Sequence, residues 1–175
     1  EYAASSGLAD RDHSPTNEIL VLSDYRGRHS QYKQDPDLMW LHQCYPFITV
    51  WDDHESANNS YMDGAENHTP GTEGDWNDRL SASVQAYHEW MPIRDPNPNN
   101  PTQIYRDFAW GGLFRLVMLD TRIIGRDEQA GTTDVAAMND PARTMLGADQ
   151  LAYLGNQLKT STEVWRVLGQ QVMFA

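Results

Sequence analysis

The sequence predicts an α+β fold, in which helices pack against a sheet that contains an antiparallel hairpin. The first of three observations is that apolar residues recur at helical spacing in several segments. The second is a pair of apolar runs, residues 104–110 and 113–119, on either side of Gly111-Gly112, which is typical of a two-residue hairpin turn. The third is an apolar run from Trp165 onward that indicates a further strand.

Two of the predicted helices begin at an aspartate that can cap them. Asp35 is followed by Pro36, a residue suited to the first helical turn, and Asp75 precedes a second helix. The apolar positions that recur are Leu38, Leu41 and Tyr45 in the first helix and Leu80, Val84, Tyr87 and Met91 in the second. A short helix over residues 24–28, capped by Ser23, and a helix that opens at Gly147 with Leu151, Leu154 and Leu158 complete the helical segments.

Between these elements lie one more strand candidate and three irregular stretches. Residues 47–51 are an apolar run that predicts a buried strand after Pro46. Residues 52–74 form a long polar loop, and loops of this length are usually functional or disordered. Residues 92–101 and 120–147 are also expected to be mainly irregular.

Composition bounds the possible partners. The chain carries 13 basic and 25 acidic residues, a net charge of -12, which repels phosphate backbones, so we expect no nucleic-acid partner. An acidic surface suits cation binding and also suits solubility alone. No apolar stretch approaches the ~20 residues of a membrane span, and no signal-peptide pattern is present. The single Cys44 allows no internal disulfide and is expected to be a small buried side chain.

The most informative stretch is "WDDHESANN", residues 51–59, directly after the strand candidate. It places the carboxylates of Asp52 and Asp53 beside the imidazole of His54 at the end of an apolar run. Carboxylate and amide oxygens suit hard cations, and a strand end is a rigid place to mount them. An equally open alternative is that the aspartates cap a turn, His54 bonds to backbone, and the asparagines satisfy loop amides.

Several standard sites are excluded. Residues 54–58 and 88–92 lack the second histidine of a zinc-protease helix. An EF-hand loop that started at Asp53 would need glycine where Asn58 stands. The sequence has no nucleophile elbow of the G-x-S-x-G type and no phosphate-binding glycine loop followed by lysine.

The same stretch resembles the signature of the PhoD-like alkaline phosphatases, a branch of the calcineurin-like metallophosphoesterases. Further segments resemble that family in order and spacing: "DYRGRHSQYKQDPDL" (24–38), "YHEWMPIR" (87–94), "IYRDFAWGGLFRLVMLDTRIIGRD" (104–127) and "VLGQQVMFA" (167–175). The implied fold is a four-layer αββα sandwich, of which residues 1–175 would be the central portion of one catalytic domain without its two flanking ends. In agreement, the chain begins at Glu1 rather than Met, its last strand is expected to run to the end, and Glu1-Tyr2 resembles the tail of a metal-binding motif that would precede residue 1.

The resemblance implies roles within the motif. Asp53 would be a metal ligand, His54 would meet the substrate phosphate as the catalytic residue, and Glu55 would take the acidic position of the superfamily's Gly-Asn-His-Asp/Glu motif. A carboxylate in place of the asparagine amide suits a hard ion such as Ca²⁺. Asp52 is assigned to the metal site too, as a ligand or as a residue that orients one.

Other residues are assigned with their alternatives. Arg28 lies in the family's tyrosine-arginine segment, where a guanidinium could clamp phosphate or be a helix-surface residue. Asn58 and Asn59 would bind substrate or support the loop. The charged residues of 120–122 are expected to be structural, and His88 is expected to be a helix-face residue rather than a ligand.

The implied activity is metal-dependent hydrolysis of a phosphoric ester, with Ca²⁺ and Fe³⁺ as cofactors and a secreted or periplasmic location. Because the family's other metal motifs would lie outside residues 1–175, the isolated chain is expected to be inactive. The alternatives are a phospholipase D-like phosphodiesterase on the same scaffold and a non-catalytic calcium-binding extracellular domain. The sequence predicts no oligomeric state and does not identify the physiological substrate.

Overall fold

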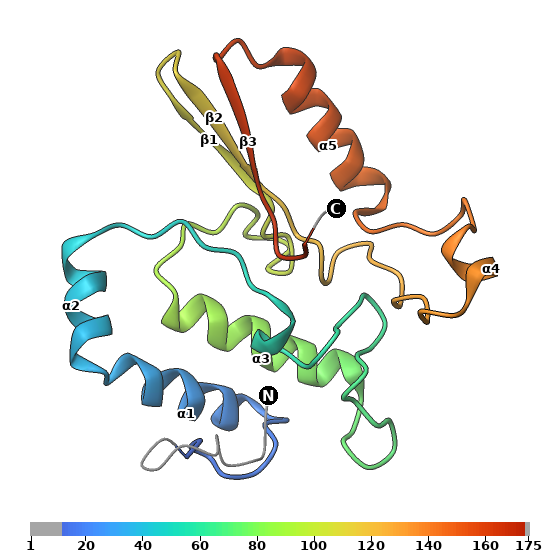
Figure 1. Ribbon diagram of the computed structural model, residues 1–175. Helices are drawn as coiled ribbons and strands as arrows, with labels where there is room; N and C mark the ends of the chain where they lie inside the picture. Colours follow the sequence, from blue (N-terminus) through green and yellow to red (C-terminus); the bar gives the residue numbers. More distant parts are fainter. Residues whose placement is uncertain (1–11, 174–175) are drawn as a thin grey trace.

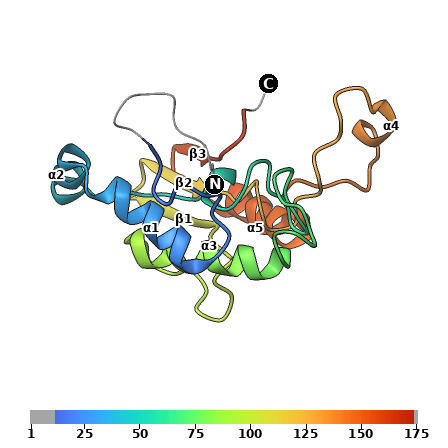
Figure 2. The same ribbon diagram turned by 90° about the horizontal axis from the view of Figure 1, so that it is seen from below.

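The computed structural model describes residues 12–173, so the expectation for Glu1 and Tyr2 falls outside the described residues. The elements, in chain order, are α1 (Leu22–Lys33), α2 (Pro36–Cys44), the 3-10 turn η1 (Asp53–Glu55), α3 (Trp76–Trp90), β1 (Arg106–Trp110), β2 (Phe114–Met118), α4 (Val135–Met138), α5 (Gly147–Thr160) and β3 (Trp165–Gly169). In Figure 1 the helices α1, α2 and α3 lie below the sheet, and α5 runs beside it. Figures 1 and 2 both place α2 and α4 at opposite ends of the molecule.

The helix α3 carries the main core, as its apolar spacing predicts. Leu80, Val84 and Tyr87 are buried on one face, where they pack with Trp51 and Ile104. The extended segment that precedes the candidate motif is thus anchored by its last residue, the buried indole of Trp51.

The helix α1 is longer than the short helix predicted from Ser23. The carboxylate of Asp24 accepts the backbone N–H groups of Leu20 and Val21, at 3.2 and 3.4 Å, which ties the start of the helix to the segment before it. Tyr25 is buried with Ala86 of α3, so α1 is held against α3 by a buried contact rather than by the local sequence alone.

The sheet has three strands in the order β1-β2-β3. Strands β1 and β2 form the predicted antiparallel hairpin, whereas β3 pairs with β2 in parallel after a connection that contains α4 and α5. Trp110 pairs with Phe114, so the turn has three residues rather than the two predicted. Gly111 adopts φ +55°, a backbone conformation that glycine reaches without strain.

Several expectations for the irregular and exposed segments need correction. Residues 47–51 are extended but form no strand, since no described strand pairs with them. Cys44 is exposed rather than buried. Asp35 caps α2 as predicted, with bonds to two backbone N–H groups, yet α2 has no buried residue. The strand β3 ends at Gly169, before the end of the chain.

The sheet and α5 expose much of their apolar surface. Leu151 and Leu158 of α5 are 59% and 41% exposed, and four of the five β3 residues are exposed. The helix predicted from Gly147 and the strand predicted from Trp165 are confirmed as α5 and β3. Because the described residues form one sheet, the four-layer sandwich stays an expectation. None of the described helices is both long and apolar enough to span a membrane.

The cap of α3 offers a test of which helix carries the core. Asp75 accepts the backbone N–H of Asn77 at 2.7 Å, so Asp75→Ala is expected to lower the free energy of unfolding of the full-length protein by about 1 kcal/mol. Asp35→Ala removes comparable bonds at α2 but is expected to melt that helix locally, with little global effect. Urea denaturation and amide hydrogen exchange measure both, and equal global losses would contradict the assignment.

Candidate active site around the 3-10 turn

The candidate motif forms a tight turn directly after the buried Trp51. The carboxylate of Glu55 accepts the backbone N–H of Asp52 at 2.6 Å, which closes η1 on itself. Burial raises the pKa of Glu55, because the charged form loses solvation there. Asp53 and His54 follow one another in η1, which is a tight turn after an unpaired segment rather than the end of a strand.

Asp53 is the buried carboxylate of the turn, only 3% exposed. One of its oxygens accepts the backbone N–H of His54 at 3.0 Å, and the other accepts that of Asn59 at 2.8 Å. These bonds orient the carboxylate but leave lone pairs on each oxygen for a further ligand.

Arg122 links the turn to the end of β2. Its Nε donates to Asp52, and its Nη2 lies 3.6 Å from Asp53 Oδ1. Asp120 supports Arg122 by accepting backbone N–H groups of residues 122–124, and burial raises the pKa of Asp120. The structural role expected for 120–122 is therefore seen at Asp120, whereas the contact of Arg122 with the motif was missed.

His54 and Arg28 line the same cavity, of about 560 Å³, although they are far apart in sequence. The His54 side chain is 42% exposed, and its Nδ1 lies 3.2 Å from Asp53 Oδ1. Arg28 is buried, and it donates to the carbonyl oxygens of Ser14 and Pro15 at 3.2 and 3.1 Å. The structure thus brings together two of the predicted site residues, one assigned to catalysis and one to substrate binding.

Asn58 and Asn59 turn away from that cavity. Their side-chain amides both donate to Glu66, at 3.1 and 2.5 Å. Asn59 adopts φ +51° and lines a separate cavity of about 310 Å³, together with Glu66 and Glu128. In this geometry the asparagines support the loop, while substrate contact remains a prediction.

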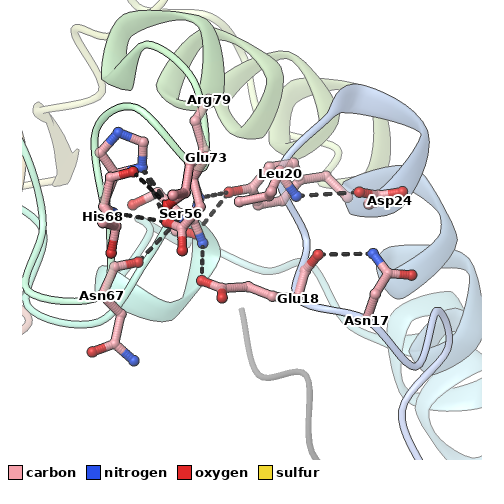
Figure 3. A network of polar contacts seen from close by, with 12 residues as sticks. Asn17, Glu18, Leu20, Asp24, Ser56, Asn67, His68, Glu73 and Arg79 are labelled. Atoms are coloured by element: carbon pink, nitrogen blue, oxygen red, sulfur yellow. Dashed lines mark hydrogen bonds and ion pairs between the residues drawn. The ribbon is translucent and has the colours of Figure 1, made fainter.

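A buried polar network, drawn in Figure 3, is bonded to the end of the turn at Ser56. The hydroxyl of Tyr25 donates to the carbonyl oxygen of Ser56 at 2.7 Å, and Arg79 Nε donates to the Tyr25 oxygen at 3.2 Å. Arg79 also pairs with Glu18 at 2.9 Å and with Glu73 at 3.2 Å. No local sequence pattern predicts this network, because its members are spread over three segments.

Two polar residues outside the turn contact backbone carbonyl oxygens. His88 Nε2 lies 2.9 Å from the carbonyl oxygen of Pro101, at the surface of α3. Gln171 accepts from Thr121 and donates to the Leu119 carbonyl, which fastens the end of β2. Neither contact resembles a ligand site.

The donor set fits a hard cation only in part. A buried carboxylate is normally paired or bound to a metal, and Asp53 has both the burial and the oxygen chemistry for that role. Asp52 is already paired with Arg122. Within residues 12–173, no group of three or more His, Cys, Asp or Glu side chains is placed to hold a metal ion.

Comparisons with known proteins agree with one another. A family model described as PhoD-like phosphatase matches residues 1–175. The chain is 40% identical over 181 residues to alkaline phosphatase D of Bacillus subtilis, a match that covers 100% of this chain and 30% of that protein. A solved structure described as "Structure of PhoD" matches with a TM-score of 0.82 and 40% identity, over 92% of this chain and 31% of the other.

Proposed function

Because the chain belongs to the PhoD-like phosphatase family, we propose that it supplies part of the active site of a metal-dependent phosphoric ester hydrolase. It spans about 30% of the length of its Bacillus subtilis relative, so the activity proposed is that of the full-length protein. The observation that carries the proposal is the turn itself. A buried carboxylate and a half-exposed imidazole stand side by side, and the imidazole lines a cavity that Arg28 also lines.

Each residue has a separate role in this proposal. Asp53 would hold a hard cation, Ca²⁺ or Fe³⁺, through its buried carboxylate. The chemistry that bound metal ions supply is activation of water and neutralisation of the charge that builds on phosphate. The ion pair between Asp52 and Arg122 would orient the turn rather than contact the substrate.

His54 would act on the substrate. Its Nδ1 faces Asp53, which fixes the ring orientation. In its protonated form the ring can donate from Nε2 to a phosphate oxygen or to the leaving group. The guanidinium of Arg28, in the same cavity, is suited to a further phosphate oxygen.

Metal removal tests the proposed activity. The full-length protein is expected to hydrolyse p-nitrophenyl phosphate or bis(p-nitrophenyl) phosphate, to lose that activity on chelation, and to regain it with Ca²⁺ and iron. The ratio of the two rates decides between a monoesterase and a diesterase. Calcium binding without hydrolysis of either substrate would identify a non-catalytic binding domain, and activity that survives chelation would contradict metal dependence.

Family membership also supports a location outside the cytoplasm, which we propose for the full-length protein. Cell fractionation followed by immunodetection tests it, and recovery in the cytoplasmic fraction alone would contradict it.

A further inference from the structure

We propose that the cavity beside His54 binds a second anionic group of the substrate, so that the preferred substrates carry a phosphate in addition to the one hydrolysed. This inference rests on the proposed hydrolase activity. The cavity is formed between α1, α2 and η1, and it extends from His54 to Lys33 and His42. Its volume of about 560 Å³ is ample for a small phosphorylated molecule.

The described lining of the cavity is rich in basic side chains, whereas the chain as a whole is acidic. The net charge of the protein is -12, and Lys33 is one of only two lysines. Lys33, Arg28 and four of the six histidines line this cavity. Among residues 12–173 the lining carboxylate is that of Glu55, which is bonded to the Asp52 N–H. A basic cavity in an acidic surface focuses anions toward it.

A contact with His42 holds the Lys33 ammonium, a hydrogen-bond donor, in place inside this cavity. Lys33 Nζ lies 3.0 Å from His42 Nε2, and because an ammonium only donates, Nε2 must accept. The His42 ring is stacked on Phe47, with centroids 4.1 Å apart, so the acceptor is held in place. The ammonium therefore has one bond that orients it and two further N–H donors.

No carboxylate within residues 12–173 lies close enough to pair with Lys33. Burial lowers its pKa, which is the shift expected of an ammonium that loses solvation without gaining an opposite charge. A phosphate group supplies that charge and accepts several N–H donors at once. His54 lines the same cavity, so a molecule with two phosphates has one candidate partner in His54 and another in Lys33.

The experiment compares two substrates that differ by one phosphate. Propyl phosphate and propane-1,3-diyl bisphosphate share the same ester, and kcat/KM is measured for both with the full-length protein, corrected for the two equivalent phosphates. The ratio in favour of the bisphosphate is expected to be about tenfold, as for one charge-assisted bond. Lys33→Met is expected to remove the preference, and Lys33→Arg, which keeps the charge, is expected to retain most of it.

Lys159→Met is the matched control. Lys159 is the other lysine and lies exposed in α5, outside the cavity, so this variant is expected to keep the preference of the parent. Thermal unfolding shows whether each variant folds, and Lys33→Gln replaces Lys33→Met if the latter does not.

Several outcomes would overturn the inference. One is equal kcat/KM for the two substrates, with hydrolysis intact; in that case the proposed activity stands and the second-phosphate site fails. Another is inorganic phosphate binding that Lys33→Met weakens without any preference for the bisphosphate, which identifies a free-phosphate site instead. If neither substrate is hydrolysed, the proposed activity fails, and calorimetric binding of the bisphosphate to the parent and to Lys33→Met still decides whether the cavity binds it.

Discussion

Arg79→Met is expected to lower the free energy of unfolding of the full-length protein by about 3–5 kcal/mol, the cost of breaking a buried ion pair from one side. Arg79 is 1% exposed, and its guanidinium bonds to Glu18, Glu73, the Tyr25 hydroxyl and the carbonyl oxygen of Asn67. Folded domains are stable by only about 5–15 kcal/mol, so this single change removes a large part of the total.

The expected loss of unfolding free energy is large because the groups that accept hydrogen bonds from Arg79 remain in the protein without that donor. Methionine fills most of the volume of the arginine stem but donates no hydrogen bond. Glu73 and the Asn67 carbonyl would then keep their desolvation cost without the interaction that offsets it. The Tyr25 hydroxyl also loses the donor that orients it toward Ser56, so the turn that carries Asp53 should loosen as well.

Arg26→Met is the matched control, because Arg26 also pairs with a glutamate. The Arg26–Glu89 pair lies at the surface, with side chains 45% and 35% exposed. Its hydrogen bonds lower the pKa of Glu89 to about 2, yet solvent and salt screen such a pair, so the unfolding midpoint should hardly change. Urea denaturation measures both variants. Similar midpoints for Arg79→Met and Arg26→Met would show that the buried network does not stabilise the fold.

The elements that could be predicted from sequence are those whose signals are local. Asp75 and its apolar series predict α3, and the glycines at 111–112 predict the hairpin, because each signal lies within a few residues of the structure that it sets. The strand prediction for 47–51 was wrong for the opposite reason. A strand is defined by a partner, and no described segment pairs with this run.

The support of the candidate site could not be predicted, since its contacts join distant segments. Arg79 reaches Glu18 across 61 residues and Tyr25 across 54, and Arg122 reaches Asp52 across 70. No pattern within a window of the sequence signals such pairs. The motif supplied Asp53 and His54 as candidates, but only the fold shows what holds them.

His54→Ala is expected to lower kcat of the full-length enzyme by ~10²-fold or more, the usual effect of removing a general acid or an oxyanion donor. Its side chain is 42% exposed and lines the cavity, and its removal leaves the backbone N–H bonds of the Asp53 carboxylate in place, so metal content should be largely retained. Asp53→Ala is expected to lower metal content as well as rate, because its buried carboxylate is the proposed ligand.

His88→Ala provides the control for a general effect of losing an imidazole. His88 lies on α3, where it contacts the Pro101 carbonyl oxygen and the edge of the Trp51 ring rather than Asp53 or His54, so its loss is expected to leave both kcat and metal content largely unchanged. Metal analysis is run beside kinetics on all three variants.

Two leaving groups then separate the possible roles of His54. If the ring donates a proton to the leaving oxygen, the penalty of His54→Ala should shrink for p-nitrophenyl phosphate relative to an alkyl phosphate, because a good leaving group needs no proton. If the ring only stabilises a phosphoryl oxygen, the penalty should be the same for both, since the charge on that oxygen develops in either reaction. A His54→Ala variant that loses metal as completely as Asp53→Ala would contradict both roles, and would indicate that His54, whose Nδ1 lies 3.2 Å from Asp53 Oδ1, is itself a ligand.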